Sequence, residues 1–117
     1  MNSRTKGKRG ELEASKALAQ HLGIDTRRTA QVDGGLSADI IGWDGVHIEV
    51  KRRKRLSAVD HLRQAERDTN GDTPIALMRE DGDTEWSVLV RLADLPALCE
   101  RYAAISGRPT YPSKGSA

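Results

Sequence analysis

The chain has 117 residues, of which 37% are hydrophobic and 31% are charged. This length and this balance predict one globular domain with a single core, and they exclude a fully disordered chain or two domains. The only cysteine is Cys99, which excludes a disulfide framework or a cysteine-based zinc site and is typical of a reducing compartment. Because no apolar run approaches the length of a membrane span or a secretory segment, we expect a cytoplasmic protein without membrane contact.

The basic residues are unevenly distributed, although the net charge is only +2. The acidic residues concentrate after position 60, whereas the basic ones form three clusters. These are Arg4, Lys6, Lys8 and Arg9 near the start, then Arg27 and Arg28, then the block Lys51-Arg52-Arg53-Lys54-Arg55. Segregated positive charge predicts a polyanion as partner, and the alternative is a solvated basic face with no partner. On a strand only alternate side chains share a face, so Arg53 and Arg55 are predicted to contact the polyanion together.

Hydrophobic periodicity and turn residues predict the elements of the domain. In chain order they are a flexible basic arm at residues 1–8, a helix at 9–22, a strand at 24–30, a loop at 31–37, strands at 38–43 and 46–51, a helix at 57–69, strands at 73–79 and 84–91, and a last helix that starts after Asp94. One domain is therefore predicted at residues 9–105. The rest, at 106–117, is rich in Gly, Pro and Ser and is predicted to be disordered. In the first helix Leu12, Leu18 and Leu22 belong to the predicted buried stripe.

The register of the two strands that flank Asp44-Gly45 follows from which positions are apolar. Even-numbered positions of both strands are apolar or small, whereas the odd-numbered positions include Asp39 and Glu49. A two-residue turn would pair even positions with odd ones and mix the two faces. We therefore predict a three-residue turn with Gly45 in the left-handed conformation, or an equivalent bulge. Either pairs position 39 with position 49 and places the two acids side by side.

Glu49 and Lys51 lie two residues apart on a predicted strand, so they project from the same face, and the hairpin brings Asp39 to them. Glu11 lies on the inward side of the first helix and adds a third carboxylate if that helix packs beside the hairpin. Clustered carboxylates suit Mg²⁺ or Mn²⁺, and the backbone carbonyl of Val50 is a further predicted ligand. Such a metal makes hydroxide available near neutral pH. Lys51 would then orient the water or stabilise the transition state.

Several of these residues also have simpler interpretations, which the sequence leaves open. Glu11 is an acid near a helix N-terminus, where the helix dipole favours negative charge. Glu13 is interpreted as a surface charge and Gln64 as a half-buried amide. His47 shares the polar face with Glu49, and a bystander role is the favoured interpretation.

Five segments between residues 6 and 80 form a series: Lys6-Gly7, Glu11, Arg28-Thr29-Ala30, Asp39-Ile40-Ile41 and Ile48-Glu49-Val50-Lys51. Together they resemble the motifs of the PD-(D/E)XK nuclease superfamily, and within it the archaeal-type Holliday junction resolvases and their small phage-encoded relatives. The resemblance implies an α/β fold of the restriction-endonuclease type. In that fold a central mixed sheet is flanked by helices in an αβββαβ order.

The resemblance also assigns expected roles to residues of this chain. Glu11, Asp39 and Glu49 would be metal-binding and catalytic, and Lys51 would be catalytic. Arg28 would contact a phosphate near the cut, and Gln64 would have a supporting role. Together with the basic clusters, this predicts nucleic-acid contacts at Lys6, Lys8, Arg9, Arg28, Arg53 and Arg55.

The leading hypothesis is an Mg²⁺-dependent endodeoxyribonuclease that resolves four-way DNA junctions as a homodimer, because two symmetric cuts in a two-fold junction need two sites. One alternative is a nicking, repair or restriction-type nuclease, since the surfaces that recognise substrate shape cannot be identified from the motifs. Another is a non-catalytic nucleic-acid-binding module whose acids are surface charges. Metal separates the last alternative from the others, because a binding module would bind DNA without metal and would be indifferent to Glu49→Gln.

Overall fold

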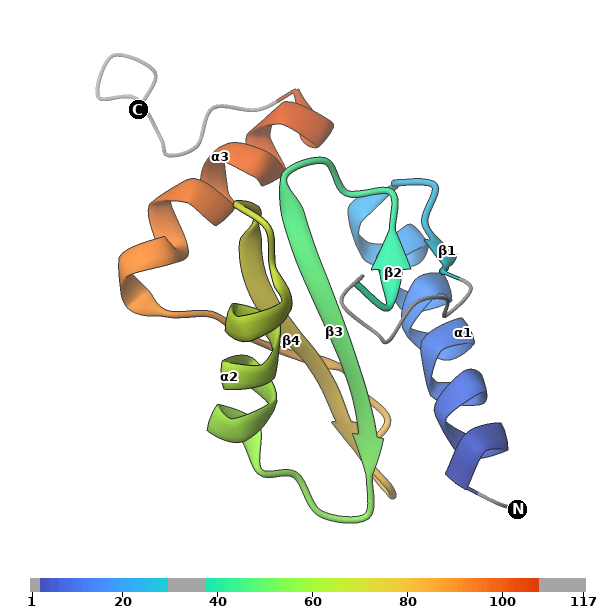
Figure 1. Cartoon of the computed structure of the whole chain (residues 1–117). Coiled ribbons are helices and arrows are strands. Elements are labelled where there is room, and N and C mark those ends of the chain that lie inside the picture. Colours follow the sequence, from blue (N-terminus) through green and yellow to red (C-terminus); the bar gives the residue numbers. More distant parts are fainter. Residues whose placement is uncertain (1–2, 30–37, 108–117) are drawn as a thin grey trace.

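The computed structural model describes residues 3–29 and 38–107 (Figure 1). The predicted loop at 31–37 lies outside the described residues. Of the predicted tail at 106–117, the described residues are Ser106, which ends α3, and Gly107, which caps it. The elements are α1 (Ser3–Leu22), β1 (Arg27–Arg28), β2 (Ile40–Ile41), β3 (Val46–Arg53), α2 (Ala58–Asp68), β4 (Thr73–Glu80), β5 (Ser87–Leu89), the short 3₁₀ helix η2 (Leu92–Asp94) and α3 (Leu95–Ser106). Among these described elements, no helix is both long and apolar enough to cross a membrane.

The five strands of the described residues form one mixed sheet in the order β1-β2-β3-β4-β5. β3 and β4 are parallel, with a register that runs from Val46 opposite Thr73 to Arg53 opposite Glu80, and the other neighbours are antiparallel. A parallel pair needs a crossover connection, and α2 provides it, lying against β4 in Figure 1. The predicted α/β class with a mixed sheet is therefore confirmed.

One face of the sheet is covered by α1 and α3. β3 turns Ile48 and Val50 to this side, where they join a buried cluster with Ala14 and Leu18 of α1. Leu98 of α3 packs against the same cluster. The core of the domain thus lies on the even-numbered side of β3, as the apolar parity of that strand predicts.

The opposite face of the sheet is covered by α2. Leu62 of α2 packs with Ala76 and Met78 of β4. In the register of the parallel pair, Glu49 lies beside Ala76 and Lys51 beside Met78, and paired residues of neighbouring strands point to the same face. Glu49 and Lys51 therefore lie on the α2 side of the sheet.

The hairpin between β2 and β3 has the predicted register. Ile40 pairs with Ile48, as the predicted register requires, and the Asp39 N–H donates to the Ile48 carbonyl over 3.0 Å just before β2 begins. Gly45 has a φ of +79°, in the left-handed region, as predicted. The Val46 N–H donates to the Trp43 carbonyl over 3.1 Å, so the turn itself is closed on two residues, and the register is reached through the alternative of a bulge before Trp43. β2 is shorter than the predicted strand because Gly42, with a φ of +122°, leaves the extended conformation. β1 and β5 are also shorter than predicted.

α1 begins earlier than predicted. It starts at Ser3 rather than at residue 9, so residues 3–8 are helical and do not form the flexible arm that the composition indicated. Lys and Arg are good helix formers, and a helix anchored by packing tolerates glycine at about 1 kcal/mol each. Gly10 is buried, and a Cβ there would lie 3.1 Å from the Cβ of Arg52. Close packing therefore explains a glycine inside this helix.

The buried side of α1 differs from the prediction at Leu12, which is 49% exposed. Ala14 and Leu18 are buried instead, and the small Ala14 lets the helix lie close to the sheet. Ser15 lies on the same side and donates its hydroxyl proton to the Thr26 carbonyl over 2.9 Å. Glu11 is also on this side, with a side chain only 14% exposed, so its inward position was predicted correctly.

Candidate active site

Asp39 is held against the middle of β3 by hydrogen bonds. Its N–H bonds the Ile48 carbonyl, and its Oδ2 accepts a hydrogen bond from the Val50 N–H over 2.9 Å. Its own carbonyl accepts a hydrogen bond from the Thr29 N–H over 3.0 Å. The carboxylate thus takes the place of the backbone acceptor that a longer β2 would offer to β3. Asp39 is only 7% exposed, so its charge lies inside the domain.

Glu49 lies on the central strand beside Asp39 and is 2% exposed. Burial raises the pKa of its carboxyl group, and the charge of Asp39 raises it further. The Nε2 of His47 lies 3.0 Å from Glu49 Oε1 and opposes this shift of the pKa. The prediction that the two acids lie side by side is confirmed by the direct interaction of their side chains, which raises the pKa of Glu49.

Glu11 reaches the site from α1 and is tied to β1. Its Oε1 accepts a hydrogen bond from Arg28 Nε over 2.7 Å. Burial is the largest influence on the pKa of Glu11 and raises it, and the charge of Asp39 acts in the same direction, whereas Arg28 and Lys51 lower it. The structure therefore brings Glu11, Asp39 and Lys51 within electrostatic reach of one another, with Arg28 bound to an acid of the site.

Lys51 lies on the same side of β3 as Glu49 and is half-buried. Its charge reaches Glu11 on one side and His61 of α2 on the other. Burial lowers the pKa of His61, and the charges of Lys51 and Arg53 lower it further. The Nε2 of His61 is buried and has no hydrogen-bond partner within the described residues. This neighbour of Lys51 could not be predicted, because His61 carries no motif.

A hard cation fits the chemistry of the donors at this place. Mg²⁺ binds through one or two carboxylates and keeps several waters, and Asp39 and Glu49 are two carboxylates whose negative charges lie side by side in a buried place. The N–H and carbonyl of a strand residue point to the same edge, so the Val50 carbonyl opens toward Asp39. Within residues 3–29 and 38–107, no three His, Cys, Asp or Glu side chains form a ready-made metal-binding group. Glu11 is engaged with Arg28 instead.

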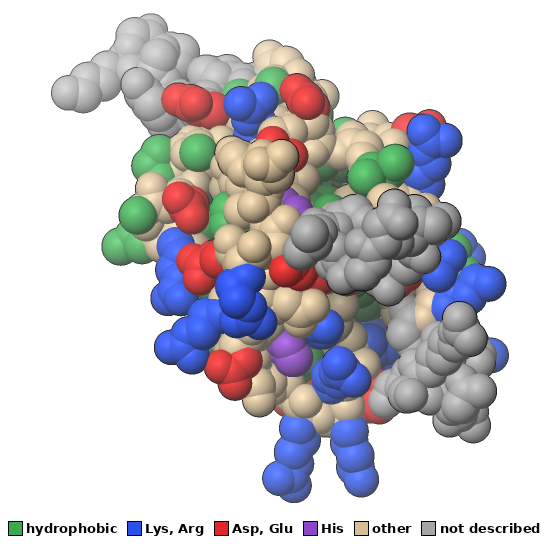
Figure 2. Space-filling view, in the orientation of Figure 1, with side chains coloured by type: hydrophobic (Ala, Val, Ile, Leu, Met, Phe, Trp, Pro, Cys, Tyr) green, Lys and Arg blue, Asp and Glu red, His purple; other side chains and the backbone are tan. Residues whose placement is uncertain are grey.

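Strand alternation separates only Arg52 from Arg53, because β3 ends at Arg53. Arg53 is exposed, and so are both Lys54 and Arg55, which follow the strand. Arg52, between β3 and α1, pairs with Glu13 over 2.8 Å and with Asp81 over 3.4 Å. In Figure 2, on the α2 side, Lys and Arg side chains gather over the lower half of the molecule, with acidic side chains among them.

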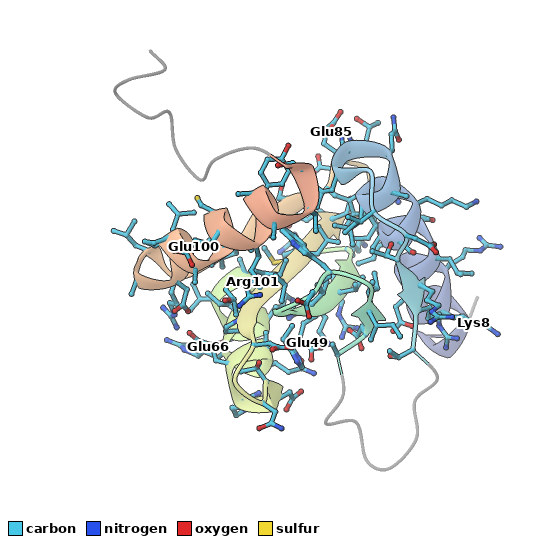
Figure 3. The ribbon with its side chains drawn as sticks, turned by 90° about the horizontal axis from the view of Figure 1, so that it is seen from above. Lys8, Glu49, Glu66, Glu85, Glu100 and Arg101 are labelled. Atoms are coloured by element: carbon cyan, nitrogen blue, oxygen red, sulfur yellow. The ribbon has the colours of Figure 1, made fainter. Side chains whose placement is uncertain are left out.

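The predicted contacts on α1 are less fully described. Lys8 and Arg9 are exposed, and Figure 3 shows Lys8 on the outer side of α1, away from the sheet. The side chain of Lys6 lies outside the described residues. Their exposure leaves Lys8 and Arg9 available to a polyanion.

Two residues, His47 and Glu13, take other places than the favoured interpretations gave them, whereas Gln64 is the half-buried amide that was predicted. His47 contacts Glu49 and is 6% exposed, so it is not a bystander. Glu13 accepts hydrogen bonds from Arg52 over 2.8 Å and from Arg79 over 2.9 Å, so it is more than a surface charge. Gln64 is half-buried on α2 and makes no side-chain hydrogen bond within the described part of the chain. One feature of the sequence could have indicated the contact of His47 with Glu49: positions 47 and 49 are both odd-numbered and therefore share a face of the strand.

Comparisons of the chain with protein-family models, with curated proteins and with solved structures find no match. The functional interpretation therefore depends on the geometry of the site and on the resemblance of its motifs. What the geometry contains is a buried pair of carboxylates on the central strand, a lysine on the same side of that strand, and a third acid on α1.

Proposed function

We propose that the protein is a metal-dependent DNA endonuclease that hydrolyses phosphodiester bonds. The observation that carries the proposal is the placement of Asp39 beside Glu49 on the central strand, with Lys51 on the same side of that strand. Burial and mutual repulsion raise the pKa of Glu49, and a bound cation would relieve the repulsion. Two crowded carboxylates next to a lysine support cation-assisted hydrolysis better than a purely structural role.

In this proposal Asp39, Glu49 and the Val50 carbonyl hold Mg²⁺ or Mn²⁺, and Glu11 is a further candidate ligand or an acid that orients Arg28. The metal would supply a polarised phosphate and a water of lowered pKa. Lys51 would hold the attacking water or stabilise the negative charge that develops on the phosphate.

DNA is the proposed substrate because exposed basic residues accompany the site. Arg53 ends the strand that carries Glu49 and Lys51, and Arg55 follows it; both are exposed. Lys8 and Arg9 are exposed on α1. Such residues neutralise backbone phosphates and position a nucleic acid without reading its sequence. Arg28, next to Glu11, is the proposed contact nearest to the cut.

The proposed substrate in particular is a four-way junction, and the proposed active form is a homodimer. Support for both comes from the resemblance of the motif series to the PD-(D/E)XK junction resolvases, and from an element order, α1-β1-β2-β3-α2-β4, that agrees with the implied αβββαβ order. A C₂ dimer has two equivalent sites, as two symmetric cuts require.

The test is cleavage of a labelled four-way junction beside linear duplex, Y-fork and single-stranded DNA, in Mg²⁺ and in EDTA. We expect paired symmetric nicks in the junction alone, abolished by EDTA. Asp39→Asn should lower the rate by more than the roughly 100-fold that loss of an outer-shell partner of a metal ligand causes. Glu66→Gln is the matched control, because Glu66 is an acid of α2 that is paired with Arg91 at the surface.

Each other result selects a different function. Metal-dependent cutting of linear or forked DNA would retain the nuclease and replace the junction with a nicking, repair or restriction-type substrate. Tight DNA binding with no cutting in Mg²⁺ or Mn²⁺, unchanged in Asp39→Asn and Glu49→Gln, would contradict the proposal in favour of a binding module.

A further inference from the structure

His47 and Glu49 form a buried pair on the central strand. They are two residues apart on β3 and therefore share a face, and both are buried, at 6% and 2% exposure. The distance from His47 Nε2 to Glu49 Oε1 is 3.0 Å. With a proton on Nε2, His47 donates a hydrogen bond to one oxygen of the carboxylate.

This contact restricts Glu49 in a way that matters at its place in the site. A glutamate side chain has three rotatable bonds, and holding it in one rotamer lowers the entropy that a binding event must remove. Because Oε1 is held by His47, the whole carboxylate keeps one orientation, in which it also faces Asp39. Ligating carboxylates are commonly fixed by such hydrogen bonds from residues that do not touch the metal.

We propose that His47 is a positioning residue of the metal site, which orients the Glu49 carboxylate for a divalent cation without binding the cation itself. This inference rests on the proposed function and adds to it a residue that the motif series does not contain. His47 acts through Glu49, so it should influence how tightly the cation binds more than whether the protein folds. Loss of the hydrogen bond should weaken cation binding about 10- to 100-fold.

The test measures Mn²⁺ binding to the DNA-free protein by electron paramagnetic resonance, at one fixed pH. His47→Leu replaces the imidazole with an apolar side chain of similar bulk that has no hydrogen-bond donor. This variant should raise the Mn²⁺ dissociation constant about 10- to 100-fold. His47→Gln places an amide N–H close to the position of Nε2 and should restore most of the affinity. A merely structural histidine would not produce this selective rescue.

A second pair of variants keeps the test decisive if His47→Leu does not fold. His47→Asn and His47→Gln are both amides, but the shorter Asn side chain reaches only to the position of Nδ1. We expect Asn to weaken Mn²⁺ binding about tenfold or more relative to Gln, with similar unfolding midpoints in EDTA. Equal affinity in the two variants would overturn the inference.

Failure of the inference is separable from failure of the proposed function. A wild-type protein that binds Mn²⁺, together with His47→Leu that binds it equally tightly, overturns the positioning role alone. A wild-type protein that binds no Mn²⁺, with or without junction DNA, overturns the metal-dependent nuclease and the positioning role with it.

Discussion

Glu49 is the residue at which folding and the proposed chemistry conflict most. An ionised carboxylate in a buried place loses hydration, and Asp39 adds repulsion, which together raise its pKa against the hydrogen bond from His47. A fold selected only for stability would place an apolar residue or an amide there. A buried acid beside a second acid is therefore a reason to expect function at this position.

The stability of the metal-free protein should report this conflict through pH. A raised pKa means that the folded state binds the proton more tightly than the unfolded state, so the contribution of Glu49 to stability is greatest below its unfolded pKa of 4.5 and is lost as pH rises through the folded pKa. Glu49→Gln should therefore increase the unfolding free energy at about pH 7.5 and change it little near pH 4. Each unit of pKa shift corresponds to about 1.4 kcal/mol.

Urea unfolding in EDTA at the two pH values measures this difference, and Glu66 provides a control of opposite sign. Hydrogen bonding to Arg91 lowers the pKa of Glu66, so its contribution is present above the unfolded pKa and is lost as pH falls through the folded pKa. Glu66→Gln should lower the stability slightly at the higher pH. A Glu49→Gln protein that is less stable than wild type at that pH would contradict the account of the buried acid.

At the scale of elements, the turn between β2 and β3 depends on glycines with positive φ. Gly42 has a φ of +122° and Gly45 of +79°, conformations that side chains with a Cβ disfavour. The surroundings of the two differ. A Cβ on Gly42 would lie 2.5 Å from the Asp25 carbonyl oxygen, which is backbone, whereas a Cβ on Gly45 would meet the flexible end of the Arg101 side chain.

Three alanine variants should separate backbone strain from steric conflict. Gly71 has a φ of +87°, and a Cβ added there would have no atom within 4 Å, so Gly71→Ala should cost about 1 kcal/mol from strain alone. Gly45→Ala should cost about the same, because Arg101 can move. Gly42→Ala should cost roughly 2 kcal/mol more, since the backbone of residues 25 and 26 must shift. Urea unfolding gives the order, and equal losses in all three would contradict the steric account.

The register of the hairpin was predictable from the sequence because a single rule determined it. Apolar side chains must lie on one face, and one extra residue in the turn or in a bulge satisfies that rule for both strands. The side-by-side placement of Asp39 and Glu49 followed directly. The contact between His47 and Glu49 did not follow, since parity puts two side chains on one face without saying which rotamers they adopt.

The N-terminal half of α1 was not predictable for a different reason. Gly7 and Gly10 among lysines and an arginine look like a flexible arm in the sequence, and no capping box marks a helix start there. Position 10 favours glycine because Arg52 packs against it. These two positions are far apart in the chain, so the sequence does not reveal their contact. Glu13 was misjudged for the same reason, since both of its arginine partners, Arg52 and Arg79, belong to the sheet.

At the scale of the whole molecule, the sheet sorts its basic residues by face. Arg52 is neutralised by Glu13 and Asp81 next to α1, whereas its neighbour Arg53 is exposed. Two adjacent arginines thus have different surroundings in the same strand, one internal and one open to a polyanion. This difference provides a matched pair for testing the proposed DNA-binding face.

Binding of a labelled four-way junction, measured by fluorescence anisotropy at several KCl concentrations without divalent metal, should distinguish the two. Arg53→Ala should weaken binding and reduce the slope of log K against log salt by about 0.9, the value for one lost phosphate contact. Arg52→Ala should leave that slope unchanged and lower the unfolding free energy instead, because Glu13 and Asp81 lose a partner. If both variants reduce the slope equally, the face of the sheet on which an arginine lies does not determine whether it contacts DNA.

The parallel pairing of β3 with β4 also has a consequence for the order of synthesis. Glu11, Asp39, Glu49 and Lys51 all leave the ribosome before the segment that forms β4, which follows α2 in the chain. Until then one edge of β3 has no partner strand, and a nascent or truncated chain that ends in the basic block presents an open edge to other chains. The proposed catalytic residues are therefore complete in sequence well before the buried site can exist.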